Sequence, residues 1–314
     1  MSSPLGSGSQ SHGRTLPGRG RALTSSRRKS LLGAAMVAPA ASCIAVFFIA
    51  PLLYTVWMSL HRWPMLGTPK FVGAENYREI VHDDMFFKTL RFTFEYTIVL
   101  TPVLLSLGLL LALLVKGVRP GTRAFRTVYF LPVPLGFAAT SYLWVWLVQP
   151  DVGPIGRLLE VIGVVDQPPF WLESSTSAML LVTAMVIWKT AGIQMILLMA
   201  GLQSIPPELN EAAKLDGAGH IRLFTNVTLP LLRPTLALVM VFSVSGSLLA
   251  FEQFYIISKG GPRNSTMTAV YWIFHEAFYS GRLGYGAALS IVLLVLLVLV
   301  SVMQVKLINK SDDL

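Results

Sequence analysis

The chain has 314 residues, of which 54% are hydrophobic and 13% are charged. A soluble globule of this length needs more polar surface, so the composition indicates a membrane protein. The net charge of +9 is spread over the connections between apolar segments, which argues against a nucleic-acid-binding domain. Cys43 is the single cysteine, so an intramolecular disulfide and a multi-cysteine metal site are excluded.

Six apolar segments are long enough to cross a membrane core, which takes about 20 helical residues. They lack the alternation of apolar and polar residues that a membrane barrel requires. The predicted fold class is therefore all-α, a polytopic membrane protein with six transmembrane helices. The runs without Asp, Glu, Lys or Arg are 31–60, 96–115, 127–150, 174–188 with 190–207, 234–251 and 283–305.

The charged residues between these segments predict the topology. Residues 1–29 are basic, lack acidic residues and resemble a disordered cytoplasmic tail. The apolar run that follows is too long for the core of a signal peptide, so we expect a retained helix. Alternating sides from this start places most Lys and Arg residues inside, which predicts that both termini are cytoplasmic. The expected parts are the tail, residues 30–87 with the first helix and an external loop, and a five-helix core over 88–310.

Local signals refine some of these elements. The third span is expected over 124–149, with Pro132 and Pro134 kinking it or delaying its regular start. The fifth span is expected from about 229 to 257. A short interfacial helix is expected near residues 155–163, in the external loop between the third and fourth spans. Gly284 begins a small-residue spacing in the sixth span that is typical of close helix packing.

A folded polar segment, residues 204–230, separates the fourth and fifth spans. Pro206, Pro207 and Glu208 are typical of a helix start, and Gly217 is typical of a helix stop. A second short helix is expected from residue 220 to residue 228, before Leu229 and Pro230 return the chain to the bilayer. The sequence therefore predicts a helix, a glycine turn and another helix on the cytoplasmic side.

This segment resembles the EAA signature of permease subunits of binding-protein-dependent ABC importers. The matching residues are Glu211, Ala212, Ala213, Gly217, Leu229 and Pro230, and Val227 stands where the signature usually has Ile. Residues 71–77 (FVGAENY) and the Gly260–Gly261–Pro262 segment are similar to sugar permeases of the maltose and glycerol-3-phosphate type. These matches reach over most of the chain from about residue 71 to residue 310.

The resemblance implies the architecture of a type I ABC importer permease in a prokaryotic cell membrane. It implies five partners: a second permease subunit, an ABC ATPase dimer, an extracytoplasmic solute-binding protein, a sugar or related polar solute, and membrane lipid. The chain has no GxxxxGK[ST] loop to cradle phosphates, so ATP and Mg are expected in the ATPase and no cofactor in this chain. The residues expected to couple to the ATPase are Glu211, Ala212, Ala213, Asp216, Gly217, Leu229 and Pro230.

Lys189 lies near the middle of the fourth span. A lysine at this depth costs about 3 kcal/mol, so it must face a partner or a wet cavity. Glu95 in the second span is one candidate partner. Other polar or aromatic residues at membrane depth could line a path for a polar solute or bond between helices. The candidate path residues are Trp188, Lys189, Gln194, Ser243, Ser247, Glu252, Gln253 and Tyr255.

Two other function classes are weighed against the importer. An ion-coupled secondary transporter predicts acidic residues at the midplane, whereas Glu95 and Glu252 are expected toward the outer surface. A membrane enzyme needs a nucleophile with a base, or paired acids at one depth, and the sequence has neither HExxH nor GxSxG. We therefore expect a non-catalytic permease subunit with no catalytic residues, no metal site and no nucleic-acid partner.

Overall fold

The computed structural model describes residues 30, 33, 35–117, 120–167 and 170–309, so the prediction for the tail lies outside the described residues. The chain divides into two compact units, residues 1–54 and 55–314. The first unit contributes a helix that includes the wide turn η1 (Ala45–Ile49) and the start of α2 (Ala50–Ser59). In the described part, the only sheet pairs β1 (His61–Arg62) with β2 (Lys70–Phe71), so the predicted all-α class is confirmed.

The described residues contain five helices that are long and apolar enough to cross a membrane. These spans are Ala35–Ser59, α4 (Asp84–Val115), α8 (Ser175–Gln203), His220–Leu248, which includes α11 (Leu229–Leu248), and Leu283–Lys306 within α13 (Leu283–Asn309). The shorter helical elements are α3 (Glu75–Val81), α5 (Thr122–Phe130), α6 (Phe137–Leu147), α7 (Pro154–Val161), α9 (Pro207–Leu215), α10 (His220–Leu223), η2 (Phe224–Thr228), η3 (Phe254–Ser258), α12 (Ala269–Phe274) and η4 (His275–Tyr279).

The expected third span consists of two helices rather than one. Helix α5 ends at Phe130 and α6 begins at Phe137, so the intervening residues form a non-helical break. Pro132 and Pro134 lie within this break, which confirms the predicted interruption. Proline removes a backbone donor and its ring clashes with the preceding helical turn, so two prolines in three residues prevent a continuous helix.

The predicted start of the fifth span is confirmed, because α11 begins at Leu229, and so is the helix predicted over residues 220–228, but the predicted end near residue 257 is wrong. Helical structure begins at His220 and continues through Pro230 to Leu248, where α11 ends. The wide turn η2 precedes Pro230, and its longer hydrogen-bond spacing lets the helix pass a residue that has no backbone donor. Residues 252–258 then form a separate short helical segment that ends in η3.

Close backbone contacts hold the helices together. Helix α4 packs along α8, and α11 packs against both. Gly192 in α8 lies so near α5 that an added Cβ would meet the carbonyl oxygen of Tyr129 at 2.1 Å. The start of α13 is equally close to β1, because a Cβ at Gly284 would lie 2.0 Å from the His61 oxygen. The close packing predicted at Gly284 is therefore confirmed.

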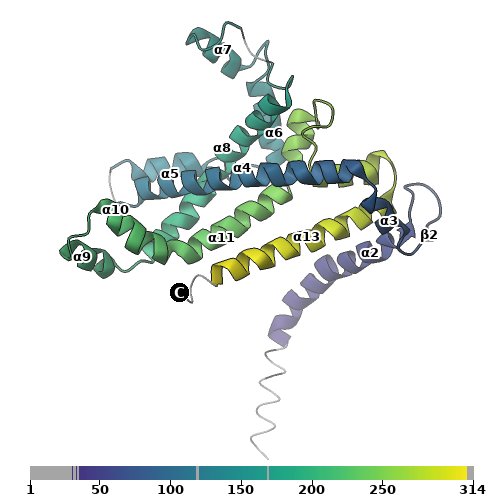
Figure 1. Cartoon of the computed structure of the whole chain (residues 1–314), viewed down its shortest axis with the longest axis horizontal. Coiled ribbons are helices and arrows are strands. Elements are labelled where there is room, and N and C mark those ends of the chain that lie inside the picture. Colours follow the sequence, from purple (N-terminus) through teal and green to yellow (C-terminus); the bar gives the residue numbers. More distant parts are fainter. Residues whose placement is uncertain (1–29, 31–32, 34, 118–119, 168–169, 310–314) are drawn as a thin grey trace, which may run out of the picture. The chain divides into compact units, whose positions relative to one another are not determined.

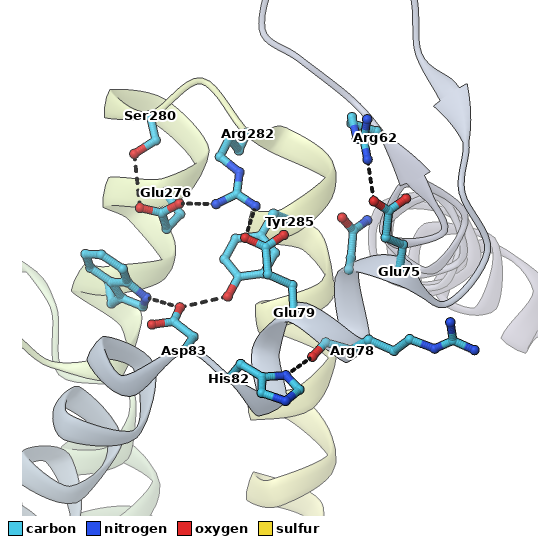
Figure 2. A network of polar contacts seen from close by, with 12 residues as sticks. Arg62, Glu75, Arg78, Glu79, His82, Asp83, Glu276, Ser280, Arg282 and Tyr285 are labelled. Carbon is cyan, nitrogen blue, oxygen red and sulfur yellow. Dashed lines mark hydrogen bonds and ion pairs between the residues drawn. The ribbon is translucent and has the colours of Figure 1, made fainter.

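A network of polar side chains joins α3, the start of α4, η4 and the start of α13, and Figure 2 shows it from close by. We call its central residues the polar cap: Glu79, Asp83, Glu276, Arg282 and Tyr285. Asp83 accepts the backbone N–H of Phe86 at 2.9 Å, which caps α4, and also accepts the Tyr285 hydroxyl at 2.7 Å. One carboxylate thus fixes the beginning of α4 to the beginning of α13.

Arg282 lies between two carboxylates of the polar cap. Its guanidinium contacts Glu276 Oε2 at 3.1 Å and Glu79 Oε1 at 2.5 Å (Figure 2). Ser280 donates to the other oxygen of Glu276 at 3.0 Å. Burial opposes the charge of Arg282, but its contacts with Glu79 and Glu276 outweigh that effect and raise the pKa of Arg282 above its ordinary value. The cation therefore balances a carboxylate that has little access to solvent.

We expect Arg282→Gln to destabilise the protein by about 1–3 kcal/mol in mixed-micelle unfolding. The physical reason is that the Glu276 side chain is only 8% exposed and loses the cation that balances its charge. Arg282 itself is 41% exposed, so solvent screening reduces the loss of stability. Arg62→Gln is the matched control, because it breaks the exposed Arg62–Glu75 pair and should cost less than about 1 kcal/mol. Equal losses for the two variants would contradict this account of the cap.

Candidate functional site

The predicted coupling segment forms α9, a glycine turn, α10 and η2. The turn contains Gly217 with φ of +78°, a conformation in which glycine is favoured, and this confirms the predicted helix stop. Helices α9 and α10 lie at one end of the long helices, and α3 and β2 lie at the other (Figure 1). The segment is thus presented at one end of the second unit.

The segment leaves large apolar side chains uncovered. Leu215, the last residue of α9, is 89% exposed, and Ile221, at the start of the His220–Leu248 helix, is 82% exposed. Glu211, Ala212 and Asp216 are also exposed, whereas Leu229 is partly buried where η2 joins α11. Ala213 and Pro230 are likewise partly buried. An open hollow beside α10 is lined by residues that include Gly217, Gly219, His220, Arg222 and Asn226.

Lys189 is buried and reaches the break between α5 and α6. Its ammonium donates to the carbonyl oxygens of Leu135 and of Val133, the latter at 3.3 Å, and lies 4.7 Å from the centre of the Phe137 ring. The suggested pairing with Glu95 is wrong, because Glu95 accepts from Arg91 one turn away at 2.7 Å. The break lacks helical hydrogen bonds, so its carbonyl oxygens are free to accept from the Lys189 ammonium.

Lys189 also lines a cavity of about 240 Å³ between α4, α6, α8 and α11. Five of the eight candidate path residues form part of its wall: Lys189, Gln194, Ser243, Ser247 and Gln253. The rest of the wall is mainly apolar, with Leu100, Val186 and Phe242 among its residues. A mostly apolar cavity with a few placed polar groups is the usual form of a small-molecule site.

The polar side chains in the wall are only partly hydrogen-bonded. Gln194 donates through Nε2 to the Ser243 hydroxyl at 2.7 Å, and Ser247 donates to the Ser243 carbonyl oxygen at 2.9 Å. The other amide atom, Gln194 Oε1, is buried and has no hydrogen-bond partner. A buried acceptor without a partner costs about 1–3 kcal/mol, so a donor that enters the cavity would relieve this cost.

The other three candidate path residues lie outside the cavity wall. Trp188 is exposed, with its ring 6.1 Å from that of Trp144. Tyr255 hydrogen-bonds through its hydroxyl to Tyr279 at 3.0 Å, and Glu252 is exposed. Of the neighbouring candidates Glu252, Gln253 and Tyr255, only Gln253 therefore reaches the wall.

Sequence reasoning missed several residues of the wall. Tyr96, Phe137 and Thr190 all line the cavity, and Tyr96 is almost wholly buried. Apolar or aromatic residues within a span carry no signal for the face that points inward. The two prolines did carry a signal, since a break at membrane depth implies free carbonyl oxygens that attract a donor.

Comparisons with known proteins show the family and the fold of the chain. The family model for the binding-protein-dependent transport system inner membrane component matches residues 96–311. The permease SmoG of a sulfoquinovosyl glycerol transport system in Agrobacterium fabrum is 33% identical, covering 90% of this chain and 92% of that protein. The trehalose/maltose permease MalF of Thermococcus litoralis is 30% identical, covering 89% of this chain and 94% of that protein.

A glycerol-3-phosphate permease, UgpA of Agrobacterium fabrum, is 31% identical, covering 88% of this chain and 94% of that protein. Among solved structures, a chain of a bacterial ABC transporter that imports alginate has a TM-score of 0.77 at 21% identity, covering 92% of this chain and 98% of that chain. These likenesses support no ion-coupled transporter. The chain belongs to the family of binding-protein-dependent transport system inner membrane components and is a permease of an ABC importer.

Proposed function

We propose that this permease forms the membrane path for a carbohydrate or related polar solute, which an external binding protein delivers and which ATP hydrolysis in a separate ATPase drives inward. The observation that carries the proposal is the cavity between α4, α6, α8 and α11. It combines apolar walls with the unpartnered oxygen of Gln194. Apolar walls suit the flat faces of a sugar ring, and the amide oxygen suits one of its hydroxyl groups.

The names of the relatives support a sugar or polyol as the solute. They include permeases for sulfoquinovosyl glycerol, trehalose or maltose, and glycerol-3-phosphate. The alginate transporter was also solved in complex with a pentasaccharide-bound periplasmic protein, at 22% identity to this chain. Delivery by such a protein fits both termini facing the cytoplasm, as the distribution of Lys and Arg predicts.

Coupling to ATP is assigned to residues 204–230. The exposed Leu215 and Ile221 are apolar surfaces that a protein partner would cover, and the exposed Glu211 and Asp216 add charges at the same place. We therefore assign the ATPase-facing role to this segment, with ATP and Mg bound by the partner. A second permease subunit completes the path, and the exposed apolar faces of the spans contact lipid.

The cavity is tested by Gln194→Leu, which removes the free acceptor and the hydrogen bond to Ser243. We expect solute uptake by the assembled transporter to fall at least about fivefold, because one lost hydrogen bond inside a water-poor site costs about 1 kcal/mol or more. Thr183→Val is the matched control, since Thr183 is also buried in α8 but bonds only to its own helix and lies outside the wall. Uptake that falls equally in both variants, or in neither, would exclude Gln194 from the path.

The coupling segment is tested by Leu215→Asp and Ile221→Asp in cells that co-express the ATPase subunits. We expect co-purification of the ATPase to fall at least about tenfold, because a buried unpaired carboxylate opposes docking. Leu66→Asp is the matched control, because Leu66 is 90% exposed in the loop between β1 and β2, away from α9 and α10. Full ATPase recovery with both segment variants would overturn the assignment.

A further inference from the structure

We propose that the solute accepted by this cavity carries an anionic group, such as a phosphate, sulfonate or carboxylate, and that Lys189 selects for it. This inference rests on the proposed function, since it specifies the chemical class of the solute. It comes from the charge of the cavity wall, and it separates anionic sugars and polyols from neutral ones.

The wall of the cavity carries one formal charge among its described residues. Lys189 is its only Lys or Arg, and it includes no Asp or Glu. The remaining polar groups are amides and hydroxyls, such as those of Gln194, Ser243 and Tyr96. The wall is therefore cationic, surrounded by the apolar side chains of four helices.

The contacts of Lys189 hold its charge in place but do not neutralise it. Two backbone carbonyl oxygens and the Phe137 ring stabilise the ammonium, and these are dipolar or quadrupolar groups without net charge. Among the acids of the neighbouring segments, Glu95 pairs with Arg91. Glu252 acts on Lys189 through its charge, but it is exposed and lies outside the wall. In a low-dielectric site a cation that has no carboxylate in direct contact acts strongly on a ligand a few ångströms away.

The rest of the cavity suits the uncharged part of such a solute. Gln194 Oε1 offers an acceptor to a hydroxyl group, and Ser247 lies one turn of α11 beyond Ser243 in the same wall. The volume of about 240 Å³ is smaller than drug-sized sites, which start near 300 Å³, so the ligand is about the size of one sugar unit. An anionic monosaccharide or polyol matches both the charge and the volume.

The charge of the cavity is measurable without knowing the solute. Gly246 lines the cavity, and a Cβ added there meets no atom within 4 Å, so Gly246→Cys places a thiol in open space. Cys43→Ala first removes the single native cysteine. The full-length protein in detergent is then treated with a negatively charged sulfonatoethyl methanethiosulfonate or a positively charged trimethylammonium-ethyl one. Leu66→Cys, on an exposed loop, reports the intrinsic reactivity of the two reagents.

We expect the ratio of anionic to cationic reaction rates to be at least about tenfold higher at Gly246→Cys than at Leu66→Cys, as a unit charge at close range in a water-poor site predicts. Lys189→Met should remove most of this preference, whereas Lys189→Arg should keep it. The arginine variant retains the charge, so it separates an electrostatic effect from a change in folding. An unchanged ratio in Lys189→Met, a preference for the cationic reagent, or no reaction at Gly246→Cys would overturn the proposal.

Protection by ligands then tests the solute class. Glycerol 3-phosphate and glucuronate should slow modification of Gly246→Cys more than glycerol and glucose do, and Lys189→Met should abolish that difference. Equal protection by the anionic and neutral compounds would contradict the anionic class. The readout needs neither ATP nor a binding protein, so it remains informative if ATP-driven uptake fails. A failure of uptake would instead count against the proposed function.

Discussion

The hydrogen bonds from Lys189 to the carbonyl oxygens of Val133 and Leu135 satisfy the constraint on which the rest of the membrane domain depends. In a bilayer core every backbone polar group must find a partner inside the protein. Pro132 and Pro134 break the third span and leave carbonyl oxygens without helical donors. The ammonium supplies the donors. The backbone can therefore be non-helical beside the cavity and expose carbonyl oxygens there. A regular helix would present only side chains.

The cavity and the coupling segment are connected by continuous helix. Ser243 lies in a helix that runs without interruption from His220, at the start of α10, to Leu248. On the other side of the segment, α9 follows α8 after a short connection, and α8 carries Lys189 and Gln194. Under the proposed coupling, a displacement of α10 would reach Ser243 through this continuous helix. A flexible joint at Pro230 would have absorbed such a displacement.

The sequence predicted the features that composition and local chemistry determine. The apolar runs, the break at Pro132 and Pro134, and the helix stop at Gly217 all follow from properties of the residues themselves. It did not predict the helix through Pro230, because a wide turn compensates for the missing donor and such a turn has no clear local signature. Nor did it identify Tyr96 or Phe137, since the inward face of an apolar helix is decided by packing.

In the candidate site, too, some features follow from the sequence and others depend on packing. Because a lysine in the middle of a span costs free energy, the sequence predicted that Lys189 would contact a partner or line a cavity. It does both. Its partners proved to be backbone atoms of another segment, which no pattern of side chains specifies. The grouping of Gln194 with Ser243 likewise depends on how α8 and α11 face each other. Sequence thus supplied the candidates, and tertiary packing selected among them.

We propose that ATP acts on the cavity through residues 204–230. The most direct test measures how fast an impermeant anionic thiol reagent modifies Gly246→Cys from the external face of the assembled transporter, with and without ATP and the binding protein. The account predicts a several-fold change in rate with ATP, as expected for a shift between two conformations, and loss of that change when a Gly/Ser linker replaces residues 211–217. A rate that does not respond to ATP, or responds equally with the linker in place, would contradict it.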